Sequence, residues 1–184
     1  MPSCLLLIGL IVISQAISAG EVIQSSVDND AGIYRISFVV EIDKDIDTVR
    51  KVVTDYANLA RLSDMLIESR VYSVPDDKLK QRLLVARVCL LFICRQVRMV
   101  ERIEPIGPDV IVTTVIPELS DFKSGQIRWR LTKLTDQRTR LEFFGEEQPD
   151  FWIPPVIGPL LIKHILHREA FIITTNIENL SADG

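Results

Sequence analysis

The sequence predicts one α+β domain, in which a long C-terminal helix packs against an antiparallel sheet. Three observations predict this class. Two short helical patterns occupy residues 43–66, strand-like runs separated by turn signals fill residues 68–147, and a helical pattern covers residues 154–180. No repeat, low-complexity tract or long polar linker divides the chain after Glu21. Residues 21–184 are therefore interpreted as a single domain.

Composition and charge restrict the function classes. The chain has 184 residues, of which 47% are hydrophobic and 25% charged, a globular composition that can bury one sizeable core. Its formal net charge is −4. A nucleic-acid-binding surface calls for clustered Lys and Arg, so no nucleic-acid partner is expected.

The first 20 residues have the layout of a secretory signal peptide. They contain no charged side chain, carry an apolar run from Leu5 to Ile13 and end in small residues. The run is short for a bilayer span, and an uncleaved membrane tether is the alternative. We expect residues 1–20 to be removed by cleavage after Ala19 or Gly20, and the domain to be exported, most simply to a bacterial periplasm. Export leaves Cys89 and Cys94 as the cysteines of the domain, in a compartment where disulfides persist.

The first strand and the two short helices follow from periodicity. In residues 32–42, positions 33, 35, 37 and 39 alternate with the more apolar positions 34, 36, 38 and 40, which predicts a half-buried strand. The segment DKDIDTVRKVVTDY predicts a helix capped by Asp45 or Asp47, and ANLARLSDML predicts a second one.

Turn signals divide the rest into an antiparallel meander. They occur at Pro75-Asp76-Asp77, Gly107-Pro108-Asp109, Ser124-Gly125 and Thr135-Asp136-Gln137. Between the first two lie about 30 residues, far more than the usual strand of about 5 to 6 residues. We therefore expect a further chain reversal within this segment.

The stretch VCLLFICRQV, residues 88–97, supplies that reversal if the chain turns between Leu90 and Ile93. Cys89 then faces Cys94, within disulfide range, and Arg82 faces Glu101. In one unbroken strand the two cysteines would lie roughly 16 Å apart, and no bond could form. The apolar four-residue spacer fits neither a redox C-x-x-C motif nor a zinc knuckle, and the turn itself lacks Gly, Asn and Pro.

The C-terminal helical pattern begins with Pro154 and Pro155, which are tolerated in the first turn of a helix, and has one broad apolar face. On a helical wheel its apolar positions cluster, with Glu169 inside the apolar arc and Asn176 two turns further along. A buried carboxylate needs a partner. One interpretation is an ion pair with a sheet arginine, Arg128 or Arg130, and the other makes Glu169 and Asn176 the polar contacts of an apolar ligand cavity between helix and sheet.

Recognisable catalytic and metal motifs are missing from the sequence. His164 and His167 have a spacing that suits a metal, but they fall on the polar face of the predicted helix without a nearby Cys or Asp cluster. Nucleophile elbows, phosphate loops and zincin motifs do not occur. No catalytic residue, metal or cofactor is therefore predicted.

Two apolar segments are poorly placed for a simple core. They are Leu90 to Ile93 at the hairpin tip and FWIPPVIGP, residues 151–159, before the last helix. Such segments cap the core or form a surface for a partner, a membrane or an entering ligand.

The order of elements and the segment VVTDYANLARLSDMLIESRVYS, residues 52–73, resemble the START-like (SRPBCC) superfamily, specifically its coenzyme Q-binding and polyketide cyclase branch. The resemblance covers residues 33–180. It implies a helix-grip fold, with a curved sheet of about six or seven strands around the last helix and a cavity for a lipid, an isoprenoid quinone or a polyketide. The export signal and the cysteine pair differ from cytoplasmic and mitochondrial members, which weakens a role in quinone biosynthesis.

The first hypothesis is therefore a non-enzymatic carrier or binding protein for a hydrophobic small molecule, with transient membrane contact. An alternative is a cyclase or isomerase with Glu169 as general acid or base, and a third is a protein-interaction module that uses the two apolar segments. No oligomeric state is predicted. The cavity is predicted to be lined by Trp129, Leu166, Glu169, Ile173, Asn176 and Ile177, with Phe92, Phe151 and Trp152 near its entrance.

Overall fold

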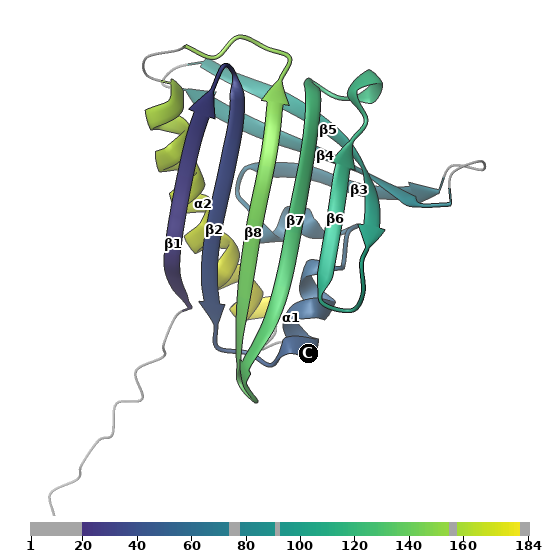
Figure 1. Cartoon of the computed structure of the whole chain (residues 1–184), viewed down its shortest axis with the longest axis vertical. Helices are drawn as coiled ribbons and strands as arrows, with labels where there is room; N and C mark the ends of the chain where they lie inside the picture. Colours follow the sequence, from purple (N-terminus) through teal and green to yellow (C-terminus); the bar gives the residue numbers. More distant parts are fainter. Residues whose placement is uncertain (1–19, 74–77, 91–92, 155–157, 181–184) are drawn as a thin grey trace, which may run out of the picture.

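A curled eight-stranded antiparallel sheet encloses one face of a long helix (Figure 1). The computed structural model describes residues 20–73, 78–90, 93–154 and 158–180. The strands are β1 (Glu21–Asp30), β2 (Ile33–Ile42), β3 (Leu66–Ser73), β4 (Lys80–Leu90), β5 (Ile93–Pro105), β6 (Val110–Val115), β7 (Phe122–Thr135) and β8 (Arg138–Pro149). The helices are α1 (Ile46–Val53), α2 (Gly158–Leu180) and the 3₁₀ turns η1 (Leu59–Leu62) and η2 (Pro117–Leu119).

The strand order is β1-β2-β8-β7-β6-β5-β4-β3, with every neighbouring pair antiparallel. In Figure 1, β3, β4 and β5 cross behind the other strands, and α2 lies on the enclosed side behind β1 and β2. The predicted α+β class and the packing of the last helix on the sheet are confirmed. The expected six or seven strands omitted β1, a largely exposed edge strand that ends in turn-forming Asp28, Asn29 and Asp30.

The hairpin of β4 and β5 has the predicted register. Cys89 pairs with Cys94 and Arg82 with Glu101, so the unbroken strand is excluded. The Sγ atoms of Cys89 and Cys94 form a disulfide. Leu91 and Phe92, between the two strands, lie outside the described residues.

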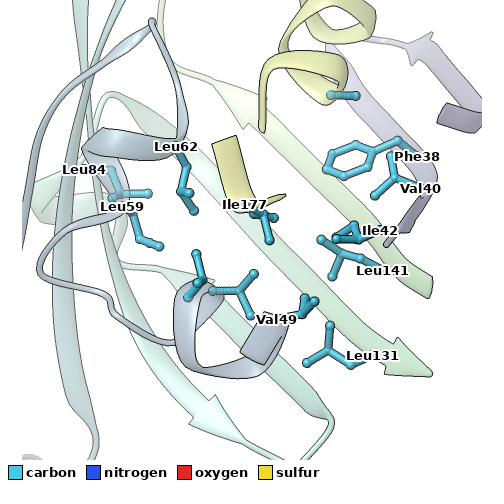
Figure 2. Close-up of a cluster of buried hydrophobic side chains, with 13 residues drawn as sticks. Phe38, Val40, Ile42, Val49, Leu59, Leu62, Leu84, Leu131, Leu141 and Ile177 are labelled. Carbon is cyan, nitrogen blue, oxygen red and sulfur yellow. The ribbon is translucent and has the colours of Figure 1, made fainter. Parts of the chain in front are cut away.

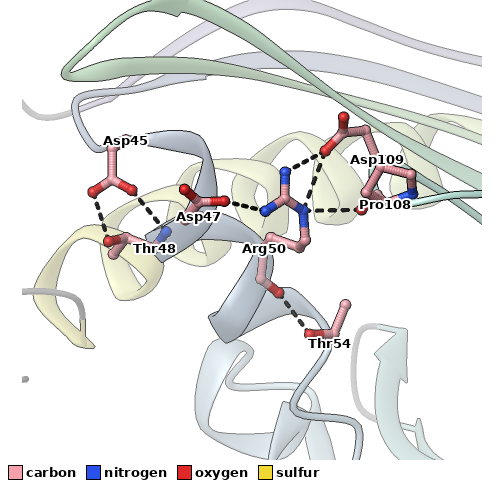
Figure 3. Close-up of polar contacts among 7 residues, drawn as sticks. All are labelled: Asp45, Asp47, Thr48, Arg50, Thr54, Pro108 and Asp109. Carbon is pink, nitrogen blue, oxygen red and sulfur yellow. Dashed lines mark hydrogen bonds and ion pairs between the residues drawn. The ribbon is translucent and has the colours of Figure 1, made fainter.

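The two short helices differ from each other in kind. Asp45 caps α1, since its side chain accepts a hydrogen bond from the Thr48 backbone N–H at 2.9 Å. Arg50 ties α1 to the turn after β5, because its Nε donates to the Pro108 carbonyl oxygen at 2.9 Å and its guanidinium pairs with Asp109 (Figure 3). The predicted second helix is only the four-residue 3₁₀ turn η1.

The predicted turns are confirmed at two places and wrong at one. The chain reverses around residues 107–109 and again between Thr135 and Arg138. Ser124 and Gly125 instead lie inside β7, next to a register shift, so they bend a strand without ending it. The Pro75-Asp76-Asp77 signal lies outside the described residues.

The main core fills one end of the space enclosed by the sheet. Figure 2 shows Ile177 of α2 between Leu62 on one side and Ile42 and Leu141 on the other. Ile42, Leu141 and Ile177 are all fully buried. This cluster joins α1, α2 and the sheet, so the space between α2 and the sheet is closed at the α1 end. Among the described residues, no helix is both long and apolar enough to cross a membrane.

Candidate functional site

A cavity of about 310 Å³ lies between α2 and the concave face of the sheet. Its size is at the lower end of the range for small-molecule sites, roughly 300–1,000 Å³. The lining combines sheet residues with one face of α2. It consists of Tyr34, Ile36, Phe38, Met65, Leu66, Arg82, Leu84, Ala86, Val88, Val97, Met99, Phe122, Ile127, Trp129, Phe143, Glu147, Pro149, Phe151, Ile153, Ile162, Ile165, Leu166, Glu169, Ala170 and Ile173.

An aromatic cluster forms part of the sheet side of the cavity. Phe38 on β2 stacks on Phe143 on β8 with ring centroids 4.5 Å apart, and Trp129 on β7 meets Phe143 edge-on at 4.8 Å. Cross-strand pairing places these residues beside each other, since Phe143 pairs with both Phe38 and Trp129. Large rings on adjacent strands thus give the cavity a rigid apolar wall.

The structure brings together four of the six residues predicted to line the cavity: Trp129, Leu166, Glu169 and Ile173. The last three lie on one face of α2, at the spacing of three and four residues that the helical pattern indicated. Their role in ligand binding stays a prediction.

Asn176 and Ile177 were expected at the cavity but do not line it. Asn176 Nδ2 donates to the Leu62 carbonyl oxygen at 3.2 Å and so ties α2 to η1. Ile177 is fully buried in the main core. A helical wheel gives the direction of a side chain but not its height along the axis, and these residues lie where α2 has passed from the cavity to the core.

Glu169 has a different partner from the predicted arginine. Ser63 lies just after η1, and its hydroxyl donates a hydrogen bond to Glu169 Oε2. Arg128 and Arg130 are exposed on β7, whereas Ile127 and Trp129 on the same strand face the cavity. Strand alternation therefore places both arginines on the outer face of the sheet, away from Glu169.

A buried polar cluster on the sheet was only partly foreseen. Arg82 Nε donates to Glu101 Oε2 at 2.7 Å, and the Thr113 hydroxyl donates to Glu101 Oε1 at 2.6 Å. The Arg82 and Glu101 side chains are only 4% and 0% exposed. The sequence predicted that the two residues face each other but gave no indication that the pair is buried, because burial depends on the curl of the sheet.

Glu147, which was not among the predicted cavity residues, places a second carboxyl group on the cavity wall. Burial raises the pKa of Glu147 to about 7, helped by the Glu101 charge and opposed by Arg82. The carboxyl group is thus mostly protonated below pH 7 and mostly ionised above it. Period-2 alternation from Leu141 through Phe143 and Gly145 leads to Glu147, so the pattern of β8 could have identified it.

The predicted entrance residues have three different outcomes. Phe151 lines the cavity and packs edge-on against Phe122 at 6.1 Å, with the Arg95 guanidinium 4.8 Å from its ring centre. Trp152 is 78% exposed and outside the lining. Phe92 lies outside the described residues. Phe151 therefore reaches β5 beside the disulfide through Arg95, and contact with a membrane stays a prediction.

The two histidines, His164 and His167, are exposed on α2. Within residues 20–73, 78–90, 93–154 and 158–180, no group of three or more Cys, His, Asp or Glu side chains is arranged to hold a metal.

The fold matches solved structures at low sequence identity. A START superfamily protein from Mycobacterium smegmatis aligns with a TM-score of 0.63 at 13% identity, over 81% of this chain and 97% of that one. A STAR-related lipid transfer protein fragment from Xanthomonas axonopodis gives 0.58 at 15% identity, over 83% and 98%. The Zhui aromatase/cyclase from Streptomyces sp. R1128 gives 0.60 at 11% identity, over 82% and 94%.

These matches show that the chain has the START-like, helix-grip fold. No protein-family model and no curated protein sequence matches it. Because one fold carries unrelated activities, function has to be argued from the cavity.

Proposed function

We propose that this protein binds a hydrophobic small molecule between α2 and the sheet, as a carrier or binding protein. The observation that carries the proposal is the cavity of about 310 Å³ with its mainly apolar lining. Structural neighbours that include a lipid transfer protein and an aromatase/cyclase support a hydrophobic ligand.

A cyclase or isomerase with Glu169 as general acid or base is the second candidate, favoured by the aromatase/cyclase neighbour. The hydrogen bonds around Glu169 argue against a role as general acid or base. The Ser63 hydroxyl donates a hydrogen bond to the Glu169 carboxyl group. Its Oγ also accepts hydrogen bonds from the backbone N–H groups of Met65 and Leu66, with N···Oγ distances of 3.1 and 3.4 Å. Glu169 thus joins α2 to the start of β3, a structural task. A pH–rate profile that changed on Glu169→Gln would favour the enzyme.

The binding proposal is tested with the neutral fluorescent probe N-phenyl-1-naphthylamine. We expect the wild-type protein to bind the probe, and Ile173→Trp to weaken binding at least tenfold, because the larger ring fills space that Ile173 now lines. Leu166→Trp provides a second, independent block of the cavity. The measurement is a fluorescence titration, with circular dichroism to establish that each variant is folded.

The matched control is Phe171→Trp, which introduces the same side chain on the same helix at a position that is 52% exposed. It is expected to leave the probe affinity unchanged. Absence of probe binding in the wild-type protein, or unchanged binding in both folded cavity variants, would overturn the proposal.

We also infer that the protein acts outside the cytoplasm, in a bacterial periplasm. The layout of residues 1–20 and the Cys89–Cys94 disulfide support this location. The contacts of Gly20 favour cleavage after Ala19. Gly20 N donates to Glu178 Oε2 at 2.8 Å, and a Cβ at this position would lie 2.3 Å from Thr174 Cγ2. Cleavage there would place a charged α-amino group beside a carboxylate, a stronger pair than the amide makes.

Intact mass spectrometry of the protein expressed with its own N-terminus tests this inference. We expect a periplasmic chain that begins at Gly20 and is lighter than the dithiol form by two hydrogen atoms. A chain that keeps residues 1–19, or one found only in the cytoplasm, would contradict export, and a chain that begins at Glu21 would contradict the role of Glu178.

A further inference from the structure

Glu147 faces the cavity from a strand whose neighbouring residues face outward. On β8, Glu146 is exposed and pairs with Arg35 at 2.9 Å, whereas Glu147 belongs to the cavity lining. Glu147 pairs across the sheet with Tyr34 of β2 and Gly125 of β7. Its carboxyl group is therefore presented to the space that the ligand would occupy.

The side chain of Glu147 lies beside a position without a side chain. A Cβ at residue 125 would be 2.6 Å from Val115 Cγ2 and 3.5 Å from Glu147 Cγ, so glycine is needed here. The Glu147 backbone belongs to the sheet, but among the described residues its carboxyl group makes no hydrogen bond or ion pair. An unpaired carboxyl group in an apolar cavity costs free energy. A bound molecule that forms a hydrogen bond with Glu147 would offset this cost.

The charges around Glu147 decide which partner it favours. Arg82, the cation on the cavity wall, is already engaged by Glu101, at 2.7 Å. Burial raises the pKa of Glu147 and the Glu101 charge adds to the rise, whereas Arg82 opposes it, so the surroundings of Glu147 disfavour a further negative charge. A ligand carboxylate placed there would be repelled, whereas a hydroxyl or ammonium group would donate a hydrogen bond.

Resting on the proposed binding function, we infer that Glu147 selects apolar ligands whose polar group donates a hydrogen bond, such as a long-chain alcohol or amine. It disfavours ligands that end in a carboxylate. The ligand class is accordingly a neutral or cationic amphiphile, and free fatty acids are excluded.

Competition against N-phenyl-1-naphthylamine tests this selection with three ligands of equal chain length: 1-dodecanol, dodecylamine and dodecanoate. At pH 8.5 we expect the alcohol and the amine to displace the probe at concentrations at least tenfold lower than dodecanoate. In Glu147→Gln the difference between alcohol and carboxylate should fall below threefold, since an amide both donates and accepts. Glu146→Gln removes the same charge from the outer face and should keep the wild-type preference, which controls for net charge.

The outcomes distinguish failure of the proposed function from failure of the inferred ligand class. If the probe itself does not bind, the proposed function fails. If the probe binds but dodecanoate competes as well as the alcohol, or if Glu147→Gln keeps the full preference, the function stands and the inference is overturned.

Discussion

Arg82→Ala is expected to lower the free energy of unfolding by about 3–5 kcal/mol, the usual cost of removing one partner from a buried ion pair. The substitution leaves Glu101 fully buried, with the Thr113 hydroxyl as its one remaining side-chain partner within the part of the chain that the structure describes. It also removes the Arg82 guanidinium from its place 5.7 Å from the centre of the Tyr56 ring. Urea unfolding of wild-type and variant protein measures the difference.

The destabilisation should depend on pH. Arg82 opposes the rise in the pKa of Glu147, which is about 7 in the wild-type protein. Without Arg82 the ionised form of Glu147 is even less favourable in the folded protein. The loss of unfolding free energy is therefore expected to be larger at pH 8.5, where Glu147 is ionised, than at pH 5.5, where it is protonated.

Two further variants separate pairing from packing. Arg82→Met with Glu101→Met removes both charges and should recover most of the lost stability, because replacement of a whole buried pair by apolar residues is often neutral. Arg35→Ala breaks an ion pair whose side chains are 42% and 47% exposed, and should cost less than about 1 kcal/mol. An Arg82→Ala effect no larger than that of Arg35→Ala would refute the buried ion pair.

The hairpin register could be predicted because several independent pairs agreed on it. Cys89 opposite Cys94 and Arg82 opposite Glu101 satisfy one register, and any one-residue slip would break both pairs. Side-chain complementarity was thus enough, although the turn residues gave no signal. By contrast, β1 is a mostly exposed edge strand with a bulge between Val22 and Gln24, and its pattern does not show a clear alternation.

The alternation of β8 indicates which face Glu147 occupies, but the burial of the polar cavity residues could not be predicted from local patterns. Besides burial, the pKa of Glu147 on β8 depends on the charges of Glu101 on β5 and Arg82 on β4, strands that are not neighbours of β8 in the sheet. The apolar face of α2 could be predicted, since helical periodicity is local, but it did not reveal where the cavity ends and the core begins. That boundary separates Ile173 from Ile177.

Ile177→Ala tests this boundary through stability. Ile177 is fully buried among α1, η1 and the sheet (Figure 2), so its truncation should cost about 2–5 kcal/mol, from lost burial and the cavity left behind. Phe171→Ala, on the exposed side of the same helix, should change stability by no more than about 0.5 kcal/mol. Urea unfolding provides both values.

Probe binding gives the complementary result. Because Ile177 is outside the lining, folded Ile177→Ala should bind N-phenyl-1-naphthylamine like the wild-type protein, whereas Ile173→Trp, one turn earlier, should not. If Ile177→Ala remained folded and lost probe affinity, the ligand space would extend past Ile173 to the α1 end. If its stability changed by less than 1 kcal/mol, Ile177 would not be a core residue. The two measurements together therefore locate the point on α2 where the helix stops lining the cavity and starts to support the fold.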